Sequence, residues 1–252
     1  MAIETWKIDE LVSQTQTQHE SNETRFQGIP HSLDATLGDQ QLGAQVFTLR
    51  GGKSDGLRIL RLVCGATEVD LCLNRGMGIT DIQRSGTRFG WDSPLGQPVH
   101  PMWVDMGEPS GLGWLDGFTE TVVRCGLASN GAPEHDEQGV LQYPLHGRIA
   151  NLPAENVRVD LDSDSGTISV TADVFETRFH FHKLRLTTTV TLRTDSNEVE
   201  ISDTVSNLYG SPAEIQMLYH NNFGAPILHE GARFLAPVAK LVPRNDLSLI
   251  HI

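Results

Sequence analysis

The chain has 252 residues, of which 38% are hydrophobic and 20% charged, and its formal net charge is −13. These values describe an ordinary globular protein that can bury roughly three quarters of the surface of its unfolded chain. The excess of Asp and Glu is scattered along the chain and repels phosphates, which argues against nucleic acid or an anionic membrane as a partner. A neutral ligand such as a sugar is compatible with this charge, and so is solubility alone.

The cysteines and the N-terminus bear on the compartment. Cys64, Cys72 and Cys125 cannot all pair and show no C-x-x-C spacing, which indicates a reducing environment. The first residues lack the apolar core of a signal peptide, and no stretch approaches the roughly 18 apolar residues of a membrane span. We therefore expect a cytoplasmic protein.

Strand patterns dominate the chain after a polar N-terminal part. Residues 1–40 are rich in Gln, Thr and Ser, with one short helix expected at 7–14. Apolar and polar residues then alternate in 58–64 and 68–73, and the intervening Gly-Ala-Thr predicts a hairpin. Further alternating strands are expected at 166–175, 184–192 and 198–205.

Long strands that follow one another without helices between them predict an all-β, antiparallel sandwich. Residues 85–153 differ, because they are rich in Gly, Pro and Trp and are expected to be loops that shape a binding site. No internal repeat or low-complexity linker divides the chain, so we expect a single domain over 1–252.

Two familiar motifs fail on inspection. Gly51-Gly-Lys-Ser54 resembles the end of a phosphate-binding loop, but Phe47 stands where the first glycine is needed, which favours a hairpin turn. His180-Phe-His182 has a spacing that suits a metal, but no suitably placed third ligand follows, which favours a solvated strand face. We expect neither a metal nor a cofactor.

Two histidine segments are the best candidates for chemistry. His146-Gly147 is followed by the hydrogen-bonding side chains of Arg148 and Asn151, and His220 lies in the segment Tyr219-His-Asn-Asn-Phe-Gly224, whose Asn221 and Asn222 add polar groups. A neutral imidazole can exchange a proton with a hydroxyl or ether oxygen near pH 7, and clustered polar groups could bind a polyol. On these residues alone, a buried histidine that caps a turn and an ordered Asn-rich turn are equally good interpretations.

Five motifs in chain order resemble a branch of the aldose 1-epimerase-like (galactose mutarotase-like) family. They are Asn-Arg-Gly-Met-Gly-Ile at 74–79, Gly-Trp-Asp-Ser-Pro at 90–94, Arg-Cys-Gly-Leu at 124–127, Leu-His-Gly-Arg-Ile-Ala-Asn at 145–151 and Tyr-His-Asn-Asn-Phe-Gly at 219–224. The resemblance implies a twisted β-supersandwich with a carbohydrate cleft.

The same resemblance implies a mechanism and a set of site residues. His220 would protonate the ring oxygen of a sugar while a glutamate takes the proton of the anomeric hydroxyl, and His146 would hold a hydroxyl or assist. The expected substrate contacts are Arg75, Arg124, Arg148, Asn151, Tyr219, Asn221 and Asn222. The expected partner is a small-molecule sugar, and neither the sugar nor the oligomeric state is predicted.

The end of the sequence departs from the family pattern. The family's glutamate lies near the C-terminus of a longer domain. This sequence ends at Ile252, which is only 32 residues (252 − 220) after His220. Residues 247–252 also resemble one reading frame of a transposon-derived sequencing adaptor, so we expect a truncated chain with a non-native tail; a short natural tail is the alternative. The alternative functions are a non-catalytic carbohydrate-binding or regulatory sandwich and a purely structural β domain.

Overall fold

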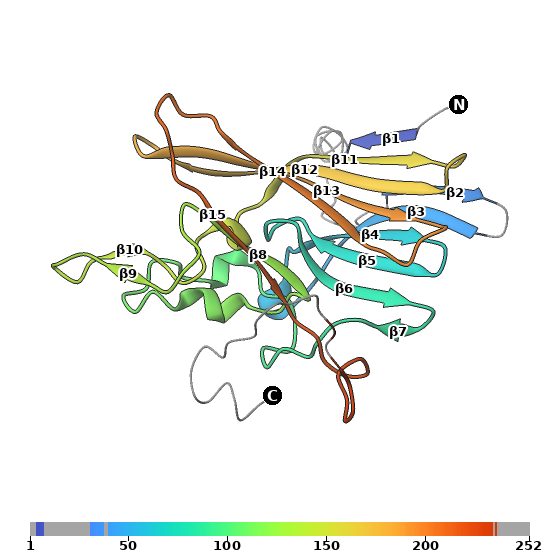
Figure 1. Cartoon of the computed structure of the whole chain (residues 1–252), viewed down its shortest axis with the longest axis horizontal. Coiled ribbons are helices and arrows are strands. Elements are labelled where there is room, and N and C mark those ends of the chain that lie inside the picture. Colours follow the sequence, from blue (N-terminus) through green and yellow to red (C-terminus); the bar gives the residue numbers. More distant parts are fainter. Residues whose placement is uncertain (1–3, 8–30, 38–39, 234, 236–252) are drawn as a thin grey trace, which may run out of the picture.

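The computed structural model describes residues 4–7, 31–37, 40–233 and 235. The tail at 247–252 and most of the helix expected at 7–14 lie outside these residues, while Lys7 ends a strand. Figure 1 shows two stacked β-sheets with an irregular region beside them.

The larger sheet is antiparallel and is formed mainly from the first half of the chain. Its order is β15 (Gln216–Asn221), β8 (Val122–Leu127), β6 (Gly78–Arg84), β5 (Thr67–Cys72), β4 (Arg58–Cys64), β3 (Gln40–Thr48) and β2 (His31–Leu37), with β7 (Thr87–Arg88) paired to β6. The strand β15 joins it from far along the chain, because its whole length pairs with β8.

The smaller sheet is also antiparallel. Its order is β1 (Glu4–Lys7), β11 (Ala154–Asp162), β12 (Thr167–Arg178), β13 (His182–Arg193) and β14 (Glu200–Asn207). The predicted all-β antiparallel sandwich is confirmed, and so are the predicted hairpin and the three later strands, of which β12 and β13 extend to 12 residues each.

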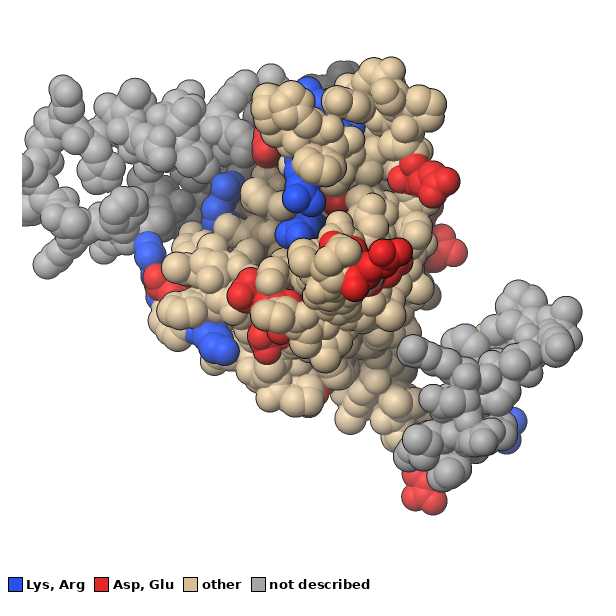
Figure 2. Space-filling model, turned by 90° about the vertical axis from the view of Figure 1, so that its left-hand side faces the viewer, with Lys and Arg blue, Asp and Glu red and all other residues tan. Residues whose placement is uncertain are grey.

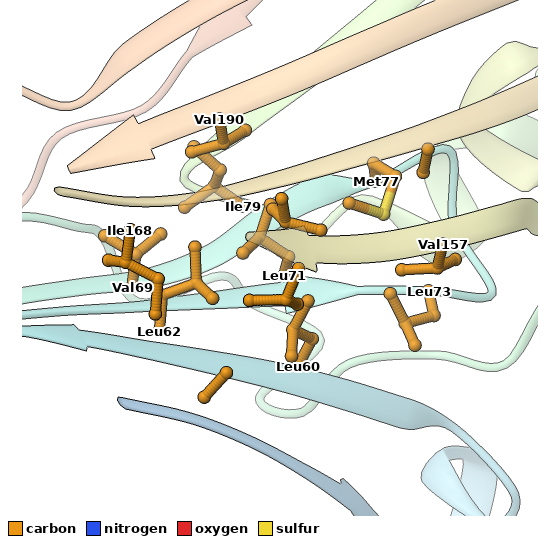
Figure 3. Packing of buried hydrophobic residues seen from close by; sticks show 14 of the residues in the cluster. Leu60, Leu62, Val69, Leu71, Leu73, Met77, Ile79, Val157, Ile168 and Val190 are labelled. Carbon is orange, nitrogen blue, oxygen red and sulfur yellow. The ribbon is translucent and has the colours of Figure 1, made fainter. Parts of the chain in front are cut away.

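One hydrophobic core lies between the sheets. Along β12 and β13 every second side chain is buried, as the period of two requires when one face of a strand packs on a core. Figure 3 shows Ile168 and Val190 from these strands packed near Leu62, Val69 and Leu71 of the larger sheet. Each such side chain contributes roughly 1.5–3 kcal/mol when fully buried.

Two predictions about the first 153 residues need correction, and a third is confirmed. The polar stretch 1–40 contributes β1 and β2, which were not predicted as strands. The Gly51–Ser54 motif is a turn between β3 and β4, with the short 3₁₀ helix η1 (Gly52–Ser54), as expected. The strand β8 lies inside the stretch that was expected to be loops.

The rest of residues 85–153 is irregular and covers the outer face of β8. It holds the 3₁₀ helices η2 (Pro101–Trp103), η3 (Gly113–Gly117) and η4 (Ile149–Asn151) and the hairpin β9 (Glu134–His135) with β10 (Leu141–Tyr143). A second small core forms here, in which Trp114 packs with Val123 and Cys125 of β8. The strand β8 is therefore buried on both faces.

Candidate active site

The two predicted histidines come together on the outer face of β8. His220 lies on β15 opposite Val123, and His146 lies in the loop before η4. Their ring centroids are 5.9 Å apart and the rings are nearly perpendicular, at 81°. Residues 74 positions apart in the sequence thus form a pair that a small ligand could touch at once.

Two aromatic side chains pack against the histidine pair. The ring centroid of Trp114 is 4.6 Å from that of His146, and the ring centroid of Phe118 is 4.8 Å from that of His220. Trp114 and Phe118 also contact each other at 4.4 Å. Because η3 and the residue that follows it supply both aromatics, this short segment forms the wall of the site.

Backbone contacts hold His146 in an unusual conformation, with φ at 59°. Its N–H donates to Gly131 O at 3.0 Å, and its carbonyl accepts from Gly126 N at 3.0 Å. The ring Nδ1 lies 3.0 Å from Asn130 O. Because a carbonyl only accepts, Nδ1 must carry the hydrogen, and Nε2 is then the acceptor of the neutral ring.

Residue 147, which follows His146, must be a glycine because backbone atoms of other segments lie where a Cβ would stand. A Cβ on Gly147 would lie 2.0 Å from Ser129 O and 2.3 Å from Gly126 O, and φ is 69° there. The small residue therefore lets the His146 segment lie directly against β8.

The surroundings of His220 favour its neutral form. Burial lowers the pKa of His220 below its ordinary value of 6.5, and the neighbouring His146 lowers it further, while the Asn222 side chain acts in the opposite direction. Its Nδ1 is buried and has no hydrogen-bond partner among the described residues. The same holds for Trp114 Nε1 and for Thr119 Oγ1, one residue beyond Phe118. Buried polar atoms are usually paired with protein, water or ligand, so these atoms mark a place where a polar ligand could bind.

Arg75 and Asn151 form a buried group with a carboxylate that the sequence analysis missed. The Arg75 Nε lies 2.5 Å from Glu120 Oε1, and both side chains have no exposed surface. Arg75 Nη1 donates to Asn151 Oδ1 at 2.6 Å. Asn151 Nδ2 in turn contacts the sulfur of Met106, which packs against Trp114. This group therefore lies next to the aromatic wall, with the Arg75 charge neutralised by Glu120.

Arg124 and Tyr219 lie on the opposite face of their strands from His220. Arg124 Nε lies 2.5 Å from Asp203 Oδ2, and the Tyr219 hydroxyl donates to the same oxygen at 2.8 Å. Asp203 belongs to β14, so these contacts are made on the side of β8 and β15 that faces the smaller sheet. The structure thus does not bring Arg124 and Tyr219 together with the histidine pair.

The remaining predicted contacts differ in exposure. Asn222 is fixed near the site, since its N–H donates to Thr121 O at 2.8 Å and its Nδ2 donates to Glu120 O at 2.9 Å. Arg148 and Asn221 are exposed. Of the expected set, the structure therefore gathers His146, His220 and Asn222 and places Arg75 and Asn151 beside the wall.

The acidic residues that the sequence analysis missed carry a recognisable signal. Val199, Ile201 and Val205 of one alternating stretch pack against the core, and Asp203 occupies the same register. Glu176 likewise continues the buried register of β12. A charged residue in the inward register of a strand marks a buried partner, because an unpaired buried charge is costly.

The described residues contain no group of three His, Cys, Asp or Glu side chains placed to hold a metal ion. His180 lies at the tip of the β12–β13 hairpin, and His182 Nε2 lies 3.7 Å from Glu176 Oε1.

None of the described helices is long and apolar enough to cross a membrane. Figure 2 shows acidic and basic side chains interspersed with uncharged surface on the side of the molecule that carries the β9–β10 hairpin.

The two stacked antiparallel sheets form a β-sandwich of the galactose mutarotase-like kind. The chain belongs to the family described as Domain of unknown function (DUF4432), which matches residues 54–249. A comparison with curated proteins gave no match.

Solved structures confirm the family resemblance. The chain is 32% identical to a "putative aldose 1-epimerase" from Klebsiella pneumoniae, with a TM-score of 0.80, and the match covers 94% of this chain and 60% of that one. A galactose mutarotase-like protein from Clostridium acetobutylicum has the same fold at 13% identity and a TM-score of 0.51, over 75% of this chain and 56% of that one. The chain thus spans about three fifths of the length of these neighbours.

Proposed function

We propose that this chain is an aldose 1-epimerase-like protein that binds a sugar at the His146–His220 pair and interconverts its anomers. The observation that carries the proposal is the pair itself, with ring centroids 5.9 Å apart and two aromatic side chains against it. The 32% identity to the Klebsiella pneumoniae protein supports a carbohydrate-related function.

In the proposed reaction His220 gives a proton to the ring oxygen while the bond between that oxygen and the anomeric carbon breaks. The proton of the anomeric hydroxyl passes to a base, an aldehyde forms and rotates, and the ring closes on its other face. His146 presents Nε2 as an acceptor for a sugar hydroxyl, because Nδ1 is engaged by Asn130 O. Glu120 is not placed to be the base, since it is fully buried and paired with Arg75.

The expected ligand is an uncharged sugar rather than a sugar phosphate. A phosphate is usually bound by free arginines, but Arg75 is neutralised by Glu120 and Arg124 by Asp203. Arg148 is exposed, and a single exposed arginine is not expected to bind a phosphate group by itself. Asn222, two residues after His220, is a candidate for contact with a hydroxyl.

Polarimetry and NMR exchange spectroscopy on a panel of aldoses and their 6-phosphates test this proposal. We expect faster exchange between anomers with a neutral aldose, and a loss of roughly 100-fold or more in His220→Ala, the usual range for removal of a general acid. His229→Ala serves as the control, because His229 is exposed and its ring lies against Glu230 O. Unchanged exchange with every sugar would overturn the enzymatic proposal.

A non-catalytic carbohydrate-binding sandwich is the second candidate. It is favoured by the lowered pKa of His220, which leaves little of the acid form at neutral pH, and by the engagement of Glu120 with Arg75. In that case a sugar should raise the melting temperature by mass action without accelerating anomer exchange. Neither stabilisation nor exchange with any sugar would leave only a structural role.

A further inference from the structure

We propose that two buried carboxylates of the smaller sheet, Asp203 and Glu176, are positioning residues that set the relative placement of the two histidines. The inference rests on the proposed function of the His146–His220 pair. Among the described residues, neither carboxylate has a hydrogen bond or ion pair with His146 or His220, and the imidazole nearest Glu176 is that of His182, at 3.7 Å. Asp203 instead reaches across the sandwich to side chains of β8 and of the His220 strand β15, and Glu176 reaches the end of β8, to which the His146 segment is bound.

Asp203 anchors the strand that carries His220. Its side chain is only 3% exposed, and its two oxygens accept from Arg124 Nε at 2.5 Å and Arg124 Nη2 at 3.0 Å. The Oδ2 atom also accepts from the Tyr219 hydroxyl at 2.8 Å. Tyr219 and Arg124 are partners in the register of β15 and β8, so one carboxylate fixes neighbouring positions of both strands.

The position of His220 follows from that of Tyr219. Successive side chains of a strand point to opposite faces, so a tyrosine whose hydroxyl is bonded to the smaller sheet directs the next side chain to the outer face. Within the described sheet β15 is an edge strand, paired with β8 alone. An edge strand lacks the second ladder that holds a central strand, so its side-chain anchor matters more for its placement.

Arg124 extends this anchor to the rest of the sandwich. Its Nη2 donates to Thr188 Oγ1 of β13 at 2.6 Å, and its Nη1 donates to Met77 O at 3.0 Å. The guanidinium therefore ties β8 to the smaller sheet and to the segment before β6. Besides its backbone pairing with β8, the His220 strand contacts this network through the Tyr219 hydroxyl.

Glu176 anchors the end of β8, to which the segment that carries His146 is bound. Its residue is 3% exposed, and its carboxylate accepts from Leu127 N at 2.7 Å and from Ala128 N at 3.4 Å. The preceding residue, Gly126, binds the His146 segment on both sides, since its N–H donates to His146 O and its carbonyl accepts from Arg148 N. Glu176 thus fixes the end of β8 against which the His146 loop lies.

These carboxylates cost desolvation energy. Removing an ion from water is expensive, and apolar residues of similar shape often stabilise a fold as well or better. Because the two carboxylates connect the smaller sheet to the strands on which the histidine segments lie, we infer that they are retained to hold the two histidines in place. A shift of about 1 Å in a catalytic group can lower a rate up to 100-fold.

Imidazole NMR of Tyr219→Phe and Glu176→Gln tests the proposal, with Tyr209→Phe as the matched control. Tyr209 is exposed to 43% and Tyr219 to 44%, so both changes remove a phenolic hydroxyl at similar exposure. Tyr219→Phe keeps the Arg124–Asp203 pair and is expected to fold. The ring signals of the two histidines are assigned from His220→Gln and His146→Gln.

We expect Tyr219→Phe to change the ring signals of His220 and Glu176→Gln to change those of His146. Tyr219→Phe should raise the pKa of His220 toward 6.5, because a loosened β15 exposes the ring and separates it from His146, and should leave His146 nearly unchanged. Glu176→Gln should change the chemical shifts of the His146 ring first. Signals that match those of Tyr209→Phe, or equal changes of both rings in both variants, would overturn the proposal.

The kinetic readout separates this proposal from the proposed function. If anomer exchange occurs, Tyr219→Phe should lower kcat about tenfold or more with little change in KM, as expected for misplacement rather than lost binding. If the wild-type chain accelerates no sugar, the proposed function fails while the NMR result still decides whether the carboxylates position the rings. Equal kcat in Tyr219→Phe and Tyr209→Phe, in an active protein, would contradict the positioning role.

Discussion

His220 combines a buried ring with a second imidazole at 5.9 Å, and both features disfavour a positive charge on it. In the unfolded chain its pKa returns to about 6.5, above that of the folded state. As the pH falls below 6.5, the unfolded chain binds a proton that the folded chain does not, so the folded state loses stability until the pH passes the folded pKa. Above pH 6.5 this contribution is fully present and constant.

Urea unfolding between pH 8 and pH 5 measures this contribution. We expect the midpoint of the wild-type chain to fall on acidification below pH 6.5, and part of that fall to vanish in His220→Gln. The difference between the two curves isolates His220 from the other histidines. Parallel curves for the two proteins over the whole range would contradict a lowered pKa.

The Arg75–Glu120 pair is fully buried, so removal of one partner leaves an uncompensated charge. We expect Glu120→Gln to lower the free energy of unfolding by about 3–5 kcal/mol. The matched control is Glu200→Gln, whose partner Arg193 lies at 2.7 Å with the two side chains 40% and 52% exposed. An exposed pair contributes little to stability, because water and salt screen its charges. Similar losses for the two variants in urea unfolding would contradict the structural role of the Arg75–Glu120 pair.

At the scale of elements, the site depends on the close contact between β8 and the loop that carries His146. Gly147 and Gly139 test this contact because both have positive φ, 69° and 79°, but only Gly147 faces neighbouring backbone. Gly139→Ala should cost about 1 kcal/mol, the conformational penalty alone. Gly147→Ala should cost several kcal/mol more and abolish sugar binding, because the added carbon meets Ser129 O and Gly126 O.

Urea midpoints and sugar-dependent thermal shifts of the two glycine variants provide the measurement. The comparison removes the cost of the left-handed backbone, which both variants share. If Gly147→Ala resembled Gly139→Ala in stability and in sugar binding, the close approach would not be needed to place His146.

Strands with one buried face can be predicted from the sequence, because their apolar and polar residues alternate, whereas strands buried on both faces lack this signal. The strands β12 and β13 alternate and were predicted, because one side of each packs on the core. The strand β8, Val-Val-Arg-Cys-Gly-Leu, is buried on both faces and shows no alternation, so it was taken for a loop. The two histidines could be identified from their motifs, but Trp114 could not be assigned to them, because its approach depends on how η3 folds over β8.

At the scale of the whole molecule, the two sheets share one core and β8 connects that core to the site. The residues buried between the sheets include Leu62 and Val69 from one sheet and Ile168 and Val190 from the other. The core around Trp114 uses Val123 and Cys125 of β8, and the same strand contributes Leu127 to the main core, against which Val122 also packs. Neither core can be disrupted without exposing β8, which supports one cooperative unit.

A single unfolding transition is therefore expected for the two sheets and the site region, and it would test the prediction of a single domain. Circular dichroism reports the strands, and tryptophan fluorescence reports in part Trp114 beside the histidines. The two signals should give the same urea midpoint, as two-state unfolding requires. Ile168→Ala, in the main core and outside the site, should lower both midpoints equally, at a cost of about 2–5 kcal/mol. A circular dichroism midpoint that moved while the fluorescence midpoint stayed in place would show that the site region unfolds independently of the sandwich.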